Sequence, residues 1–159
     1  MAKIVDLDHK WATLVGRFLI AFAAMESLTL QTLKEWLKAP VYRHVMNMRF
    51  GQRVDLIVDL AQEQDAPADK VEAFTRNLEK AKKLAEKRNA VAHNPLVLCL
   101  FDGEHNLTEA IASDKKEHEI IEFEELEQLA LQAEALEEEL LESKVALRLH
   151  DFDLRDLRS

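Results

Sequence analysis

The stretch from Val71 to Pro95 constrains the fold more than any other, because it joins a long helical pattern to a fixed end. Apolar residues recur there at steps of three and four, which is the period of an amphipathic helix. Pro95 cannot continue a helix, and it moves Asn94 out of the α region. The sequence therefore predicts a long helix that begins near residues 67–69 and ends at or next to His93. Its apolar stripe consists of Val71, Phe74, Leu78, Ala81, Leu84, Ala85, Val91 and Ala92.

The apolar stripe is interrupted close to its C-terminal end. At about 100° per residue, Arg88 falls inside the stripe, and Asn89 and His93 share its rim because they are four residues apart. An arginine in an apolar seam is costly unless it is paired or half exposed in a cleft. We therefore interpret Arg88, Asn89 and His93 as the candidate functional group of the chain.

Helical patterns fill most of the remaining sequence. Residues 9–38, 41–65 and 123–149 each carry an apolar stripe at helical spacing, and Pro40 is expected to end the first of these helices. Glycine and proline are scarce, at three each, which favours long helices over a loop-rich chain. The sequence predicts an all-α fold, an up-and-down bundle of four main helices.

One segment departs from the helical pattern. Residues 96–101 have strand propensity, residues 102–106 form a turn, residues 107–111 return as a second strand, and residues 119–121 offer a third. We expect a small β-hairpin insertion over about residues 96–121, before the last helix. The domain then covers residues 1–150, and residues 151–159 form a C-terminal tail.

The cysteine, histidine and hydropathy patterns exclude several classes of protein and of binding site. A single cysteine, Cys99, excludes an intrachain disulfide framework and suits a reducing cytoplasm. His105 and His118 lack companions at metal-ligand spacing, so we expect surface roles for both, and no metal or cofactor. The start of the chain lacks the shape of a signal peptide, and the longest apolar run, residues 18–25, is too short to span a bilayer. We expect a cytoplasmic protein without a membrane partner.

The net charge of −9 is unevenly distributed along the chain. Residues 1–94 carry 15 Lys and Arg against 12 Asp and Glu, whereas residues 95–159 carry 6 against 18. The half that contains Arg88 is therefore mildly basic, and the other half is strongly acidic. This balance is not that of a tight nucleic-acid binder overall, although it leaves room for local binding.

The order Arg88-Asn89-x-x-x-His93, followed by Asn94-Pro95 near the end of a long helix, resembles the signature of the HEPN superfamily. The resemblance covers roughly residues 9–149, but only these few residues match a motif. It implies a helical bundle whose catalytic members are metal-independent endoribonucleases, with two motifs that face each other across a dimer cleft. Some members act in toxin–antitoxin or phage-defence systems, and others keep the bundle as a binding module without cleavage.

Ribonuclease chemistry without a metal needs a group that takes the 2′-hydroxyl proton and a fixed cation for the charge that develops on phosphorus. His93 can serve as the first and Arg88 as the second, because a guanidinium offers planar donors to phosphate. Asn89 can hold the imidazole or a phosphate oxygen. We favour an RNA-cleaving enzyme over a non-catalytic dimeric module that binds or regulates. An antitoxin or other regulatory protein is the further partner that the resemblance implies.

Glu26 is the only charged residue between Arg17 and Lys34. It is either a partly exposed helix glutamate or a buried carboxylate that pairs with Arg88 and orients its guanidinium, and the sequence leaves both interpretations open. The helix that carries Glu26 is apolar on almost every side. Such a helix must be covered on more than one side, so we expect a homodimer formed through the first and third helices.

Two further sets of residues are candidates for RNA binding. The first is a basic ridge on the helix of Arg88, opposite its apolar stripe, and the second lies at the start of the second helix. Solvated helix faces explain both sets, and we favour that interpretation; the functional alternative is a salt-dependent contact with phosphates and bases. The ridge consists of Arg76, Lys80, Lys83 and Lys87; the second set consists of Tyr42 and Arg43, with His44, Arg49 and Arg53 beside them.

Overall fold

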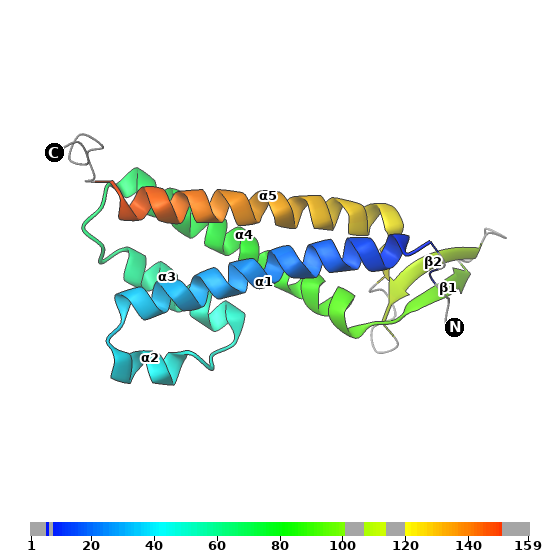
Figure 1. Cartoon of the computed structure of the whole chain (residues 1–159), viewed down its shortest axis with the longest axis horizontal. Coiled ribbons are helices and arrows are strands. Elements are labelled where there is room, and N and C mark those ends of the chain that lie inside the picture. Colours follow the sequence, from blue (N-terminus) through cyan, green and yellow to red (C-terminus); the bar gives the residue numbers. More distant parts are fainter. Residues whose placement is uncertain (1–5, 7, 101–106, 114–119, 151–159) are drawn as a thin grey trace. The chain divides into compact units, whose positions relative to one another are not determined.

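The computed structural model describes residues 6, 8–100, 107–113 and 120–150. Within these residues the chain is mostly helical, with five helices and one small antiparallel sheet of three strands (Figure 1). The helical class and the small sheet before the last helix are therefore confirmed. The elements are α1 (Lys10–Trp36), α2 (Ala39–Val45), α3 (Phe50–Ala61), α4 (Ala68–His93), β1 (Leu96–Leu100), β2 (Leu107–Ala112), β3 (Ile120–Glu122) and α5 (Phe123–Arg148).

The region between α1 and α4 differs from the prediction. A single helix over residues 41–65 was expected, but the chain forms α2 and α3, and residues 46–49 separate them. Pro40 lies in the first turn of α2, where a missing N–H costs nothing, so it starts a new helix after α1 has ended at Trp36. The backbone N–H of Arg49 donates to Gln52 Oε1 at 3.2 Å, a capping contact that begins α3.

The sheet has the order β1-β2-β3, so β2 is its central strand. Leu96 pairs with Ile111 in the first ladder, and Ile111 pairs with Ile121 in the second. Ala110, Ile111 and Ala112 at the end of β2 are all buried. Because side chains alternate along a strand, both faces of the sheet are covered here. The predicted turn, with His105, and the segment with His118 lie outside the described residues, as does the predicted tail.

The chain divides into two compact units, each built from separate stretches of sequence. The first unit comprises Met1–Ala23 and Leu84–Ala135, and the second comprises Ala24–Lys83 and Leu136–Ser159. Both units therefore contain part of α1, part of α4 and part of α5. The sheet belongs to the first unit, whereas α2 and α3 belong to the second.

In the first unit, α1 is fixed to the sheet and to α5. Trp11 Nε1 donates to Glu109 Oε2 at 2.8 Å, and the Trp11 ring meets Phe123 edge-on at 5.2 Å between centroids. Arg17 forms two hydrogen bonds with Glu134, of 2.7 and 2.6 Å. These contacts advance along both helices together, so α1 and α5 run in the same direction here. In a bundle of four helices with strict up-and-down alternation, the first and last helices would be antiparallel. The parallel contact of α1 and α5 in this unit therefore does not show that alternation.

In the second unit, polar contacts join α4 to both α3 and α5. Asn77 is buried and its Nδ2 donates to the carbonyl oxygen of Glu139 at 3.1 Å and to Ser143 Oγ at 3.3 Å. Lys82 on α4 forms an ion pair with Asp55 on α3. A large apolar core lies beneath these contacts, and its fully buried side chains include Met25, Leu33, Val54, Ile57, Phe74, Leu78 and Leu140.

The first helix has the length and hydropathy of a membrane-spanning segment, with a mean hydropathy of 1.5 over its most apolar window. The core helix of a soluble protein meets the same two criteria. In this structure α1 buries Phe18, Phe22 and Met25 against other parts of the chain, and its Arg17 pairs with Glu134. The apolar character of α1 is therefore used at least partly for core packing.

Candidate functional site

The C-terminal end of α4 is fixed in the first unit by burial and by a side-chain cap. Leu84, Ala90 and Val91 are buried, and the helix ends at His93 as predicted. The carbonyl oxygen of Ala90 accepts from both the backbone N–H of Asn94 at 3.2 Å and Asn94 Nδ2 at 2.9 Å, which strengthens the last turn. Pro95 then leads directly into β1, so the last turn of α4 is held between the core and the sheet.

Arg88 lies on the inward side of this helix end. It is half-buried, and its guanidinium carbon lies 4.9 Å from the ring centroid of Phe22 on α1. Phe22 itself is only 1% exposed, and the Nε atom of Arg88 is buried. A cation over an aromatic face within about 6 Å is attracted by the ring quadrupole. This contact gives the arginine a defined position at the edge of the core.

Asn89 and His93 lie on the outward side of the same helix end, and both are exposed. Their spacing of four residues puts them on one face, as expected. Arg88 is about 100° from Asn89 and about 140° from His93 around the helix axis. The structure thus brings Asn89 and His93 together in one chain, whereas Arg88 occupies a different sector of the helix.

Glu26 and Arg88 belong to different compact units, so their predicted pairing stays a prediction. Glu26 has a contact within its own unit, because its Oε1 lies 3.8 Å from Arg53 NH2. Arg53 was expected on a solvated face at the start of the second helix, and that expectation is wrong. Its side chain is buried: Nε donates to Thr29 Oγ1 at 3.2 Å, and NH1 donates to the carbonyl oxygen of Met48 at 3.0 Å.

The sequence contains a signal for the burial of Arg53 in its spacing from two apolar residues. Arg53 follows Phe50 by three residues and precedes Ile57 by four, so it lies inside the apolar stripe of α3. In the structure its guanidinium lies 5.8 Å from the Phe50 ring centroid. Arg53 therefore ties α1 to the connection between α2 and α3.

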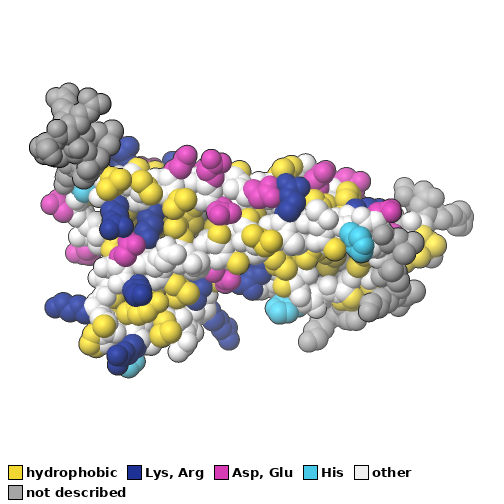
Figure 2. Space-filling model, in the orientation of Figure 1, with side chains coloured by type: hydrophobic (Ala, Val, Ile, Leu, Met, Phe, Trp, Pro, Cys, Tyr) yellow, Lys and Arg dark blue, Asp and Glu magenta, His cyan; other side chains and the backbone are white. Residues whose placement is uncertain are grey.

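The basic ridge of α4 is exposed along its length, as expected, but acidic residues of α5 contact part of it. Lys80 Nζ lies 2.9 Å from Glu139 Oε2, and Lys87 Nζ lies 2.7 Å from Glu125 Oε1. On the face drawn in Figure 2, acidic side chains in magenta follow α5, with basic side chains between them. The positive charge available to a phosphate backbone is thus reduced at two of the four ridge positions.

The second candidate RNA-binding set is separated from the ridge residues in sequence and lies on the short helix α2. Tyr42 is half-buried, and Arg43 is exposed. Within the described residues, no group of three or more His, Cys, Asp or Glu side chains is arranged to hold a metal ion. Arg88, Asn89 and His93 stay the predicted catalytic group.

Comparisons with family models, with characterised proteins and with solved structures give no match for this chain.

Proposed function

We propose that this chain is a HEPN-like, metal-independent endoribonuclease that cleaves RNA by 2′-hydroxyl transesterification. The observation that carries the proposal is the position of Arg88 against Phe22, at the same helix end that exposes Asn89 and His93. A fixed guanidinium and a solvent-accessible imidazole are the two groups that this chemistry requires.

In the proposed reaction, His93 takes the proton of the 2′-hydroxyl, and the 2′ oxygen bonds to phosphorus. The bond from phosphorus to the 5′ oxygen breaks, and the leaving oxygen takes up a proton. The products are a 2′,3′-cyclic phosphate and a free 5′-hydroxyl. Arg88 stabilises the negative charge on the phosphoryl oxygens, and Asn89 orients the imidazole or a phosphate oxygen.

We further propose that the active form is a homodimer, since Arg88 and His93 of one chain lie about 140° apart around α4. A second copy can supply the missing group from the opposite side. Ile20 on α1 is 73% exposed, and a Cβ added to Gly16, one turn earlier, would meet nothing within 4 Å. This face of α1, in the same unit as His93, supports an interface formed by α1 and α4.

The remaining parts of the proposal follow from the resemblance in the sequence. We propose a helical bundle of four main helices, α1, α3, α4 and α5, in the cytoplasm. The activity would belong to a toxin or a phage-defence component, held inactive by an antitoxin or another regulatory protein until needed.

The decisive experiment incubates the purified protein with mixed cellular RNA in EDTA, beside His93→Ala and the matched variant His150→Ala. His150 also lies at a helix C-terminus, that of α5, but it belongs to neither candidate RNA-binding set. Cleavage by the wild type and His150→Ala, with cyclic phosphate ends and no cleavage by His93→Ala, is the expected result. Equal cleavage by all three proteins would move the site elsewhere.

A non-catalytic dimeric module is the second candidate, and one observation favours it. Glu125 and Glu139 form ion pairs with two of the four ridge residues, which weakens the surface that RNA would approach. A stable dimer that leaves RNA intact in the same assay would support this alternative.

A further inference from the structure

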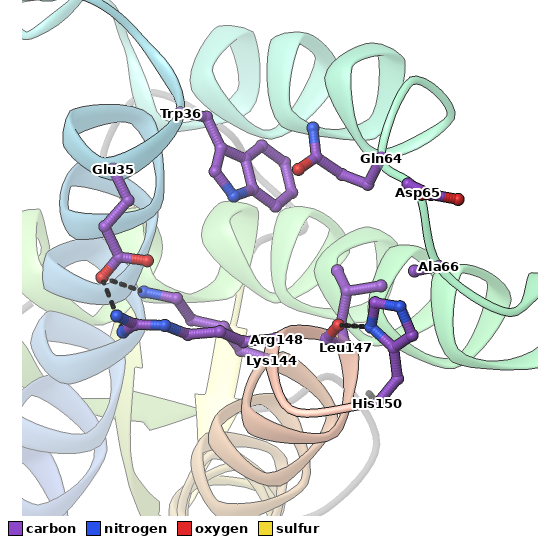
Figure 3. A pocket seen from close by; sticks show the side chains of 9 residues that line it. All are labelled: Glu35, Trp36, Gln64, Asp65, Ala66, Lys144, Leu147, Arg148 and His150. Carbon is purple, nitrogen blue, oxygen red and sulfur yellow. Dashed lines mark hydrogen bonds and ion pairs between the residues drawn. The ribbon is translucent and has the colours of Figure 1, made fainter. Parts of the chain in front are cut away.

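The second unit contains a hollow of about 400 Å³ that the proposed ribonuclease site does not use (Figure 3). Its walls come from the C-terminal end of α1, the segment after α3 and the C-terminal end of α5. Pockets for small organic ligands typically measure about 300–1,000 Å³. The hollow is therefore large enough for a small molecule with one or two rings.

One wall of the hollow has more positive groups than negative groups. Glu35 Oε1 lies 3.2 Å from Lys144 Nζ and 3.8 Å from Arg148 NH1, so one carboxylate serves two cations. The side chain of Lys144 is only 10% exposed, whereas that of Arg148 is 70% exposed. Asp65, on the far wall, directs its carboxylate away from these groups (Figure 3). The wall formed by Glu35, Lys144 and Arg148 thus carries one excess positive charge.

Another part of the hollow is lined by an aromatic and an aliphatic side chain. The Trp36 indole and the Leu147 side chain enter it from α1 and α5 (Figure 3). Trp36 is held in place by Phe74, which it meets at 74° with 6.2 Å between ring centroids. Gln64 Nε2 donates to the carbonyl oxygen of Leu60 at 3.0 Å, so the amide of Gln64 is also fixed. An aromatic ligand could stack or pack here without rearranging the wall.

The helix ends limit the charge that such a ligand can carry. α1 ends at Trp36 and α5 ends at Arg148, and both of these residues line the hollow. Helix C-termini carry partial negative charge, which opposes a dianion such as a phosphate monoester more strongly than a monoanion. A single carboxylate matches the one excess positive charge, and arginine pairs with carboxylates in a favourable planar geometry.

We propose that this hollow binds a small aromatic carboxylate, with its ring against Trp36 and Leu147 and its carboxylate at Lys144 and Arg148. The proposal is independent of RNA cleavage, because no residue that lines the hollow belongs to the Arg88, Asn89 and His93 group. The chain has only two tryptophans, Trp11 and Trp36, which makes the site directly observable.

The test uses the full chain labelled with 5-fluorotryptophan and followed by fluorine NMR, with Trp36→Phe to assign the two resonances. Indole-3-acetate should shift the Trp36 resonance in a saturable way and leave that of Trp11 unchanged. Arg148→Gln should weaken binding by about tenfold, the usual effect of losing one charged hydrogen bond. Lys70→Gln removes a positive charge on α4 outside the hollow and should leave binding unchanged.

Two comparison ligands separate the proposed chemistry from simpler explanations. Indole-3-ethanol has the same ring without the carboxylate, and adenosine monophosphate offers a phosphate in its place. Both should bind at least about tenfold more weakly than indole-3-acetate. The proposal is overturned if Trp36 shows no saturable shift, if indole-3-ethanol binds equally well, or if Lys70→Gln weakens binding as much as Arg148→Gln does.

Discussion

Arg88 holds its guanidinium carbon 4.9 Å from the ring centroid of Phe22, a residue that is almost completely buried. The contact links α4 to α1 inside the first unit. A cation at such a position is desolvated on one side and gains stability from the aromatic face. Arg88, which interrupts the apolar pattern of α4, therefore has a defined position against Phe22.

This contact gives a first prediction about activity. Phe22→Leu removes the aromatic face, so Arg88 loses its fixed position, and RNA cleavage should fall by about fivefold, corresponding to about 1 kcal/mol. The matched variant is Phe74→Leu, because Phe74 is an equally buried phenylalanine in the second unit. Initial cleavage rates would be compared at temperatures where circular dichroism shows both variants folded. Equal losses in the two variants would mean that Phe22 acts only through stability.

The buried Arg53 leads to a prediction about stability. Arg53→Gln removes its contact with Glu26 and disrupts the hydrogen bonds to Thr29 and Met48. Losing a buried, hydrogen-bonded charge should lower the free energy of unfolding by about 2–3 kcal/mol. Arg43→Gln, at an exposed position on α2, should change it by less than about 0.5 kcal/mol. Urea unfolding followed by circular dichroism measures both, and similar values would contradict the role assigned to Arg53.

The pair of Arg17 and Glu134 predicts a dependence of stability on pH. Hydrogen bonds from Arg17 lower the pKa of the Glu134 carboxyl in the folded chain. Its contribution to stability is therefore fully present above the pKa of the unfolded chain, about 4.3, and is lost as the pH falls through the lower folded value. Urea unfolding of the wild type and Glu134→Gln should differ at pH 6 and converge towards pH 3. If the difference in stability stays constant over this range, the ionisation of Glu134 does not contribute to the pH dependence of stability.

The ion pairs along the basic ridge predict that RNA binding can be strengthened. Glu125→Gln and Glu139→Gln together release Lys87 and Lys80, so the affinity for single-stranded RNA should rise and its salt dependence should steepen. Glu142→Gln is the control, because Glu142 is an exposed acid on the same helix. Binding would be measured at several salt concentrations in a His93→Ala background, which should prevent the proposed cleavage. An unchanged salt dependence in the double variant would exclude the ridge from RNA binding.

The exposed apolar face of α1 predicts a specific effect on assembly. Ile20→Glu places a charge on the proposed interface, so light scattering at micromolar concentration should show a monomer in place of a dimer. Leu107→Glu is the matched control, since Leu107 is 60% exposed on β2 and should leave the dimer intact. A wild-type monomer, or a dimeric Ile20→Glu variant, would contradict this interface.

The sequence was sufficient to predict those helix ends and strands whose signals lie within a few residues. Pro95 determined the end of α4, and the alternation after it identified the strands, because these signals act within a few residues. The separation of α2 from α3 was missed because residues 46–49 between them contain neither glycine nor proline, the strongest local signals of a helix break. Arg53 was misassigned because its charge was given more weight than its position between Phe50 and Ile57.

Contacts between distant parts of the chain were harder to predict. Nothing in the spacing of Arg88 identifies Phe22 as the ring beneath it, because that contact depends on how α1 and α4 pack. The positions of Asn89 and His93 on one face could be predicted, since helix geometry alone fixes them. The pairing of ridge lysines with acids of α5 likewise required the packing of two helices.

The interleaving of the two units has a consequence for dissecting this protein. Because α1, α4 and α5 each pass from one unit into the other, neither unit corresponds to a continuous stretch of chain. No single cut of the polypeptide therefore separates the two units from each other. The first half of α1 belongs to the same unit as Leu84–Ala135, and residues 24–83 of the other unit lie between these two parts in the sequence. Either part taken alone lacks the other half of its core.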